Sequence, residues 1–127
     1  MGADKILIVD DNPTNLKLVA YLMQQHGYAV ETAFDATSAL AAIATAPPAL
    51  ILMDLQMPGI DGLELTRRLK ADAATKDITI IAVTAYAMKG DQEKALAAGC
   101  DDYVTKPIDT RALPVTVAKY LNRGGTP

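Results

Sequence analysis

The chain has little of what marks secreted and membrane proteins. It contains a single cysteine among 127 residues, so no internal disulfide is possible, as is typical of a reducing cytosol. No apolar run approaches the ~20 residues that a membrane-spanning helix needs. The first residues, MGADKILIVDD, carry acids where a signal peptide needs a basic start followed by a long apolar stretch. We therefore expect a cytoplasmic protein without membrane insertion.

Positive charge is also in short supply. Twelve basic residues face 15 acidic ones, and the formal net charge of −3 gives no general attraction to nucleic acid or anionic membrane. We find no internal repeat and no linker. Half of the residues are hydrophobic and 21% are charged, as expected for a soluble core. This predicts one domain over residues 1–127, with a core at about 5–121 and a frayed tail at 122–127.

Short apolar runs alternate with segments of helical period along the whole chain. The runs are rich in Ile, Leu and Val, like strands that are buried on both faces, and predict strands at 5–10, 29–34, 50–54, 78–83 and 102–105. Helices are predicted at 13–26, from a cap at Asp35 to the prolines at 47 and 48, at 62–71, at 91–98 and towards 121. Strict βα alternation predicts a doubly wound α/β fold, a parallel sheet with helices on both faces.

Punctuating residues set the ends of these helices. Asn12 is a good N-cap for the first helix, and Gly27 is a good stop signal after it. Pro114 is the awkward residue, because it would lie inside the last helix if Asp109 were the cap. Either that helix starts near Leu113, or its first turn is distorted.

Polar side chains stand at the ends of four of the five apolar runs. Asp10 and Asp11 end the first run, and Asp54, Thr84 and Lys106 stand at the ends of the third, fourth and fifth. Functional groups of parallel α/β sheets gather at the carboxyl ends of the strands, so we expect these five in one crevice. Taken singly, each residue also fits an ordinary turn, strand or surface role. Three acids together favour a hard cation, and ligation by oxygen alone suits Mg²⁺.

The same side chains indicate phosphoryl chemistry. Asp54 is the natural nucleophile, because carboxylates can act as covalent acceptors. A metal would offset the charge of this carboxylate and of the phosphoryl oxygens. Lys106 would supply a cation for one phosphoryl oxygen, and Thr84 a hydroxyl for another. Gly59 and Gly62 permit an unusual loop beside Asp54.

With these motifs, the chain resembles response-regulator receiver domains, the CheY-like modules of two-component signalling. The resemblance runs from Lys5 to about Leu121 and rests on the acid pair, on MDLQMPGIDG around Asp54, on Thr84 followed by alanine, and on Lys106 followed by proline. It implies a five-stranded sheet of order 2-1-3-4-5 with five helices. The chain looks most like stand-alone cell-cycle receivers of the DivK type and receivers attached to hybrid kinases, which short motifs do not separate.

The resemblance also implies roles for single residues. Asp54 would accept a phosphoryl group from a histidine kinase or a histidine phosphotransfer protein, with only slow self-catalysed phosphorylation and dephosphorylation. Asp11, Asp54 and the backbone carbonyl of Gln56 would bind Mg²⁺ directly, and Asp10 would help, often through water.

Further residues would report the phosphorylated state and meet partners. Thr84 and Tyr103 would form the switch that changes affinity for a downstream protein target. The protein would be a monomer that could dimerise on phosphorylation. The implied partner-binding residues are Thr14, Asn15, Leu18 and Pro107 towards the kinase, and Tyr86 and Lys89 on the reporting side.

Other function classes fit parts of this pattern less well. Aspartyl phosphatases typically place a second acid two residues after the nucleophile, where this chain has Gln56, which cannot protonate a leaving group. Flavin or nucleotide binding needs an anion cradle after the first strand, where Asp10 and Asp11 would repel a phosphate without a metal. A degenerate receiver would lack part of the set. We therefore expect a signalling protein that is not an enzyme and does not bind nucleic acid.

Overall fold

The structure, a computed structural model, describes residues 4–55, 62–84, 89–106 and 108–121 as five βα units in succession. The bounds agree with the predicted ones within one or two residues at most ends. The strands are Lys5–Val9 (β1), Ala29–Ala33 (β2), Leu50–Asp54 (β3), Thr79–Thr84 (β4) and Asp102–Thr105 (β5). The helices are Pro13–Gln25 (α1), Ala36–Thr45 (α2), Gly62–Ala71 (α3), Lys89–Ala98 (α4) and Ala112–Leu121 (α5).

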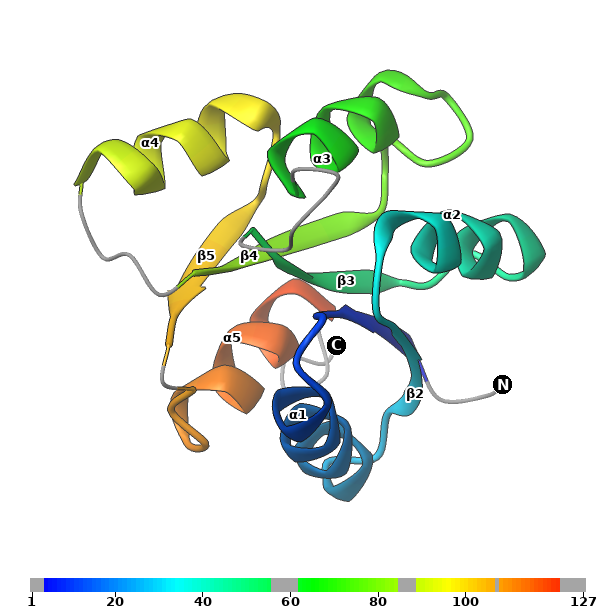
Figure 1. Cartoon of the computed structure of the whole chain (residues 1–127). Helices are drawn as coiled ribbons and strands as arrows, with labels where there is room; N and C mark the ends of the chain where they lie inside the picture. Colours follow the sequence, from blue (N-terminus) through cyan, green and yellow to red (C-terminus); the bar gives the residue numbers. More distant parts are fainter. Residues whose placement is uncertain (1–3, 56–61, 85–88, 107, 122–127) are drawn as a thin grey trace.

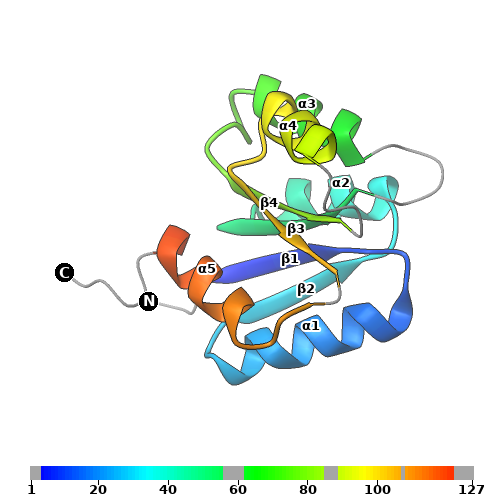
Figure 2. The same cartoon turned by 90° about the vertical axis from the view of Figure 1, so that its left-hand side faces the viewer.

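The strands form one parallel sheet with the predicted order, β2-β1-β3-β4-β5. Helices α1 and α5 cover one face of the sheet, and α2, α3 and α4 cover the other (Figures 1 and 2). The chain winds outward in both directions from β1 and β3, so the strand order reverses between these two neighbours. Ligands of doubly wound sheets bind at this reversal, outside the carboxyl ends of the strands.

The central strands are buried on both faces, which explains why they read as continuous apolar runs. On β1, Ile6 and Ile8 pack under α1 and α5, whereas Leu7 and Val9 face the other helical layer. Successive residues of a strand point to opposite faces, so each strand feeds both cores. No helix within the described ranges is long and apolar enough to cross a membrane.

Local signals set both ends of the first helix, as predicted. Asn12 has extended backbone angles, and its side-chain oxygen accepts a hydrogen bond from the N–H of Asn15 at 3.1 Å. Pro13 follows as the first helical residue, where its missing N–H has no intrahelical partner to lose. Gly27 has a φ of 90°, the left-handed conformation that ends a helix and favours glycine.

The last helix resolves the question raised by Pro114. The Asp109 carboxylate accepts hydrogen bonds from the N–H groups of Arg111 at 2.9 Å and Ala112 at 3.1 Å. Its carbonyl also accepts one from the N–H of Leu113 at 3.0 Å. Asp109 thus caps a turn that leads into the helix, and the helix proper begins at Ala112. Pro114 lies buried in the first helical turn, where a proline is tolerated.

Candidate functional site

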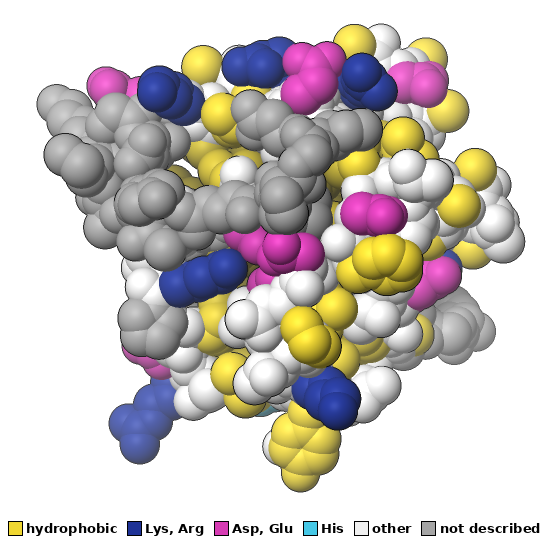
Figure 3. Space-filling model, in the orientation of Figure 1, with side chains coloured by type: hydrophobic (Ala, Val, Ile, Leu, Met, Phe, Trp, Pro, Cys, Tyr) yellow, Lys and Arg dark blue, Asp and Glu magenta, His cyan; other side chains and the backbone are white. Residues whose placement is uncertain are grey.

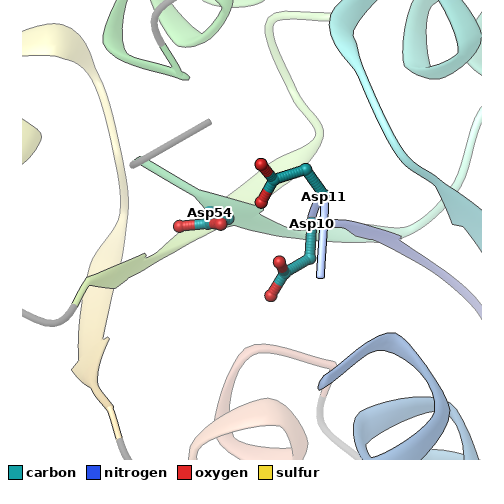
Figure 4. Close-up of side chains that lie close together, drawn as sticks. All are labelled: Asp10, Asp11 and Asp54. Atoms are coloured by element: carbon teal, nitrogen blue, oxygen red, sulfur yellow. The ribbon is translucent and has the colours of Figure 1, made fainter. Parts of the chain in front are cut away.

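Three carboxylates converge at the carboxyl edge of the sheet. Asp10 and Asp11 follow β1, and Asp54 ends the neighbouring strand β3. One oxygen of each carboxylate lies within 4.8 Å of those of the other two. Asp11 reaches towards Asp54, while Asp10 points towards the side of the sheet that α1 and α5 cover (Figure 4). The acids therefore meet at the strand reversal, as their positions at strand ends predict.

Burial differs among these acids. Asp10 is 3% exposed and Asp54 is 2% exposed, whereas Asp11 is open to solvent. A buried carboxylate is costly unless hydrogen bonds or opposite charge compensate it. The space-filling view shows acidic side chains near the middle of this face, beside a basic side chain (Figure 3).

Lys106 is the cation that faces the acids. Its Nζ lies 3.4 Å from Oδ1 of Asp54 and 3.8 Å from Oδ2 of Asp10. Its backbone N–H donates to the carbonyl of Thr84 at 2.8 Å, which anchors the lysine just past the end of β5. Among the residues that the structure describes, one ammonium group faces three carboxylates. The remaining donor set, carboxylate oxygens in a partly buried crevice, fits a hard divalent cation such as Mg²⁺.

The backbone of Asp10 and its neighbours bends the chain into α1. The Asp10 N–H continues the sheet pairing by donating to the carbonyl of Ala33 at 3.0 Å. Its side-chain Oδ1 then accepts the N–H of Asn12 at 2.9 Å, a short turn that starts the helix. Its Oδ2 accepts a hydrogen bond from the side-chain amide of Asn15. Both oxygens of Asp10 are thus engaged by the first turn of α1.

Thr84 lies at the same edge of the sheet. It is the last residue of β4 and is 3% exposed. The preceding residue, Val83, pairs with Asp54, so Thr84 stands one step beyond the acid on the next strand. The structure therefore brings together the side chains of Asp10, Asp11, Asp54 and Lys106 and places Thr84 at the same edge of the sheet.

The start of α3 packs directly against the backbone of Asp54. A Cβ at Gly62 would lie 2.7 Å from the carbonyl oxygen of Asp54 and 3.0 Å from Cα of Leu55. The sequence analysis expects Gly62 to permit an unusual loop. In the structure Gly62 is instead the first residue of α3, and its missing Cβ allows a close approach to the backbone of Asp54. Gly59, the other glycine of this stretch, lies outside the described residues.

Tyr103 lies on β5, away from the acids. It is half-buried and packs against the core layer under α2, α3 and α4. Together with Ile108 and Leu113 it lines a cavity of about 280 Å³ at the β5 edge. The cavity lies on the side of α5, whereas Tyr103 packs against the other core layer.

The predicted partner residues that the structure describes lie on α1. Thr14 is exposed, and the side chain of Leu18 is 44% exposed. Asn15, assigned to the same surface from the sequence, is half-buried and turns its amide inward to Asp10. Its spacing from Asp10 carries no motif that predicts this contact. Outside the described residues lie Gln56, Tyr86 and Pro107, together with the side chain of Lys89.

Comparisons with known proteins match nearly the whole chain. The family model of the response regulator receiver domain matches residues 6–118. The polar-differentiation response regulator DivK of Brucella ovis is 41% identical over 116 residues, which are 91% of this chain and 94% of that protein.

Solved structures agree with the fold. A putative response regulator from Chloroflexus aurantiacus superimposes with a TM-score of 0.90 at 30% identity, covering 95% of this chain and 99% of that one. The receiver domain of a sensor histidine kinase from Pseudomonas aeruginosa, with magnesium in its active-site cleft, has a TM-score of 0.87 at 32% identity, with coverage of 95% and 99%. The matched ranges include the strand ends that carry the acids. This chain belongs to the family of response regulator receiver domains of two-component signalling.

Proposed function

We propose that this chain is a stand-alone receiver whose Asp54 accepts a phosphoryl group from a histidine kinase or a histidine phosphotransfer protein. The observation that carries this proposal is the environment of Asp54. Its carboxylate is 2% exposed, ends the central strand β3, and lies 3.4 Å from the ammonium group of Lys106. Two further acids lie within 4.8 Å of it, so the described side chains of this crevice carry excess negative charge.

The excess negative charge supports a bound Mg²⁺. Asp11, Asp54 and the backbone carbonyl of Gln56 would hold the ion, with Asp10 acting through water. When bound, Mg²⁺ offsets the charge of the acids and of the incoming phosphoryl oxygens. The magnesium-bound receiver domain from P. aeruginosa supports this assignment by likeness.

The transfer is a displacement at phosphorus. A lone pair of an Asp54 carboxylate oxygen forms the new P–O bond as the P–N bond of the donor phosphohistidine breaks. The electron pair of that bond passes to the donor imidazole, which leaves neutral when its other ring nitrogen is protonated. The product is an acyl phosphate, and the chain's own part is to hold the carboxylate in line and to exclude competing groups.

Two side chains would then report the new state. Lys106, already beside Asp54, would pair with one phosphoryl oxygen, and the hydroxyl of Thr84 would donate to another. These contacts exist only after phosphorylation, so they favour one of two conformations. Tyr103, half-buried on β5, would change the orientation of its ring as the second part of the switch.

The setting follows from charge and from the family. We place this activity in the cytoplasm, with a kinase or phosphotransfer protein upstream and a protein target downstream. The net charge of −3 does not favour nucleic acid as the target. The chain would act as a monomer until phosphorylation, when a dimer could form.

A labelling experiment tests the proposal. Acetyl phosphate with Mg²⁺ should phosphorylate the wild-type protein, and Asp54→Asn should abolish labelling. Asp77→Asn is the matched control, because Asp77 is an exposed acid in the α3–β4 connection. Labelling that persists in Asp54→Asn, or that is lost equally in Asp77→Asn, would contradict the assignment.

A further inference from the structure

Asp10, Asn12 and Asn15 form a closed ring of hydrogen bonds at the start of α1. The N–H of Asn12 donates to Oδ1 of Asp10 at 2.9 Å, and the side chain of Asn12 accepts the N–H of Asn15 at 3.1 Å. The side-chain amide of Asn15 closes the ring by donating to Oδ2 of Asp10. A helix cap and a site carboxylate are therefore held by the same three residues.

The ring fixes the orientation of a buried carboxylate. Asp10 is 3% exposed, so rotation of its carboxylate would leave an oxygen without a donor. The two donors come from different residues and engage different oxygens, which selects one rotamer. Lys106 lies 3.8 Å from Oδ2, which is a charge contact but too long for a hydrogen bond.

We propose that Asn15 is a positioning residue for the metal site. Its amide holds the Asp10 carboxylate in one orientation, in which one oxygen lies within 4.8 Å of oxygens of Asp11 and Asp54. The inference rests on the Mg²⁺ site of the proposed function. Groups that hydrogen-bond a metal-binding side chain orient it, and their loss typically weakens metal affinity about 10–100-fold.

The alternative is a purely structural amide that only satisfies a buried carboxylate. Both readings expect Asn15→Ala to lower stability. Only the positioning reading expects a loss of Mg²⁺ affinity that passes through Asp10.

Calorimetric titration with Mg²⁺ alone separates the two readings. Asn15→Ala should bind Mg²⁺ about tenfold more weakly than the wild type. The matched control is Gln25→Ala, which removes another side-chain amide of α1, one that donates to the Tyr21 hydroxyl at 2.7 Å on the exposed surface. Gln25→Ala should keep the wild-type affinity.

A double-mutant cycle with Asp10→Asn identifies the route of the effect. If Asn15 acts through Asp10, the double variant should bind Mg²⁺ less than twofold more weakly than Asp10→Asn alone. Melting temperatures without metal identify any variant that fails to fold. The side-chain amide protons of Asn15 should also shift in NMR spectra when Mg²⁺ is added to the wild type.

The outcomes are distinct. If the wild type does not bind Mg²⁺, the metal site of the proposed function fails. If the wild type binds Mg²⁺ and Asn15→Ala binds within twofold of it, the positioning role is wrong. The positioning role is also wrong if Asn15→Ala lowers Mg²⁺ affinity by a full tenfold in the Asp10→Asn background. It is wrong as well if Gln25→Ala lowers Mg²⁺ affinity as much as Asn15→Ala does.

Discussion

The ammonium nitrogen of Lys106 lies 3.4 Å from Oδ1 of Asp54, a carboxylate that is almost completely buried at the end of the central strand. The lysine therefore lies beside two of the three acids of the crevice. It pairs with Asp54, and it would compete with the proposed Mg²⁺ for the charge of the same carboxylate.

The competition predicts the effect of removing the lysine. Lys106→Ala should lower the melting temperature without metal. The loss in free energy of unfolding should be smaller than the ~3–5 kcal/mol typical of a broken buried pair, because the lysine side chain is 24% exposed. The rise in melting temperature on adding millimolar Mg²⁺ should be larger than in the wild type. Lys94→Ala, which removes an exposed lysine of α4, should change neither quantity. An equal or smaller Mg²⁺ response in Lys106→Ala would show that the lysine and the metal do not compete.

The same variant separates phosphorylation of Asp54 from the change in affinity for the downstream protein. Lys106→Ala should still take up some label from acetyl phosphate, because Asp54 remains. Its phosphorylated form should gain less affinity for the downstream protein than the phosphorylated wild type gains. A full gain, measured by binding with and without acetyl phosphate, would remove Lys106 from the switch.

Gly62 predicts a conflict between helix propensity and packing. Alanine favours a helix by about 1 kcal/mol over glycine. At this position, however, the new Cβ would lie 2.7 Å from the carbonyl oxygen of Asp54, and overpacking of this kind costs ~1–3 kcal/mol. We expect the clash to prevail, so Gly62→Ala should unfold at lower urea concentration and label more slowly. A variant that is more stable than the wild type would show that α3 does not press on Asp54.

The helix caps predict how stability depends on acid. Hydrogen bonds from the backbone N–H groups of Arg111 and Ala112 hold the pKa of Asp109 below its usual value. Hydrogen bonds from the backbone N–H and the hydroxyl of Ser38 lower the pKa of Asp35 in the same way. A lowered pKa contributes stability above the unfolded value of about 4, and this contribution is lost as pH falls through the folded value.

Replacing a cap without removing it isolates this effect. Asparagine caps helices about as well as aspartate but does not titrate in this range. Asp109→Asn should therefore keep stability near that of the wild type at pH 7 and lose less of it between about pH 5 and about pH 3. Urea unfolding at several pH values measures this slope. An unchanged slope would mean that the cap does not contribute to the acid dependence.

A charge at Leu18 should affect phosphorylation by a protein donor but not by a small molecule. The side chain is 44% exposed on α1, so a charge there should disturb a partner surface more than the core. Leu18→Asp should slow transfer from the kinase or phosphotransfer protein while leaving labelling by acetyl phosphate intact. Leu96→Asp, at a leucine that is 49% exposed on α4, is the control for transfer from the kinase. If Leu18→Asp slows both donors equally, the kinase-facing surface lies elsewhere.

The strand ends were predictable because two simple patterns coincide there. Continuous apolar runs mark strands that are buried on both faces, and β1 and β3 are buried in this way. Polar residues at the ends of such runs must then lie at one edge of a parallel sheet. The sequence alone therefore predicts that Asp10, Asp54 and Thr84 lie at the same edge of the sheet.

Contacts between side chains of different elements were less predictable. Asn15 is a polar residue in the first turn of a helix, where exposure is the usual expectation. Its inward amide depends on how the turn after Asp10 is bent, which no local pattern encodes. Gly62 is likewise visible in the sequence as a glycine near Asp54. The reason why a glycine is needed, the close approach of α3 to the backbone of Asp54, is a tertiary contact that the sequence does not show.

The central claim is that the phosphoryl group resides on Asp54, and chemical mapping tests it most directly. The protein is phosphorylated with acetyl phosphate and Mg²⁺, treated with borohydride to reduce the acyl phosphate, digested, and analysed by tandem mass spectrometry. We predict conversion of Asp54 alone to homoserine, with no conversion when Mg²⁺ is chelated. Conversion at Asp10, Asp11 or an acid outside the crevice, with Asp54 unmodified, would contradict the account.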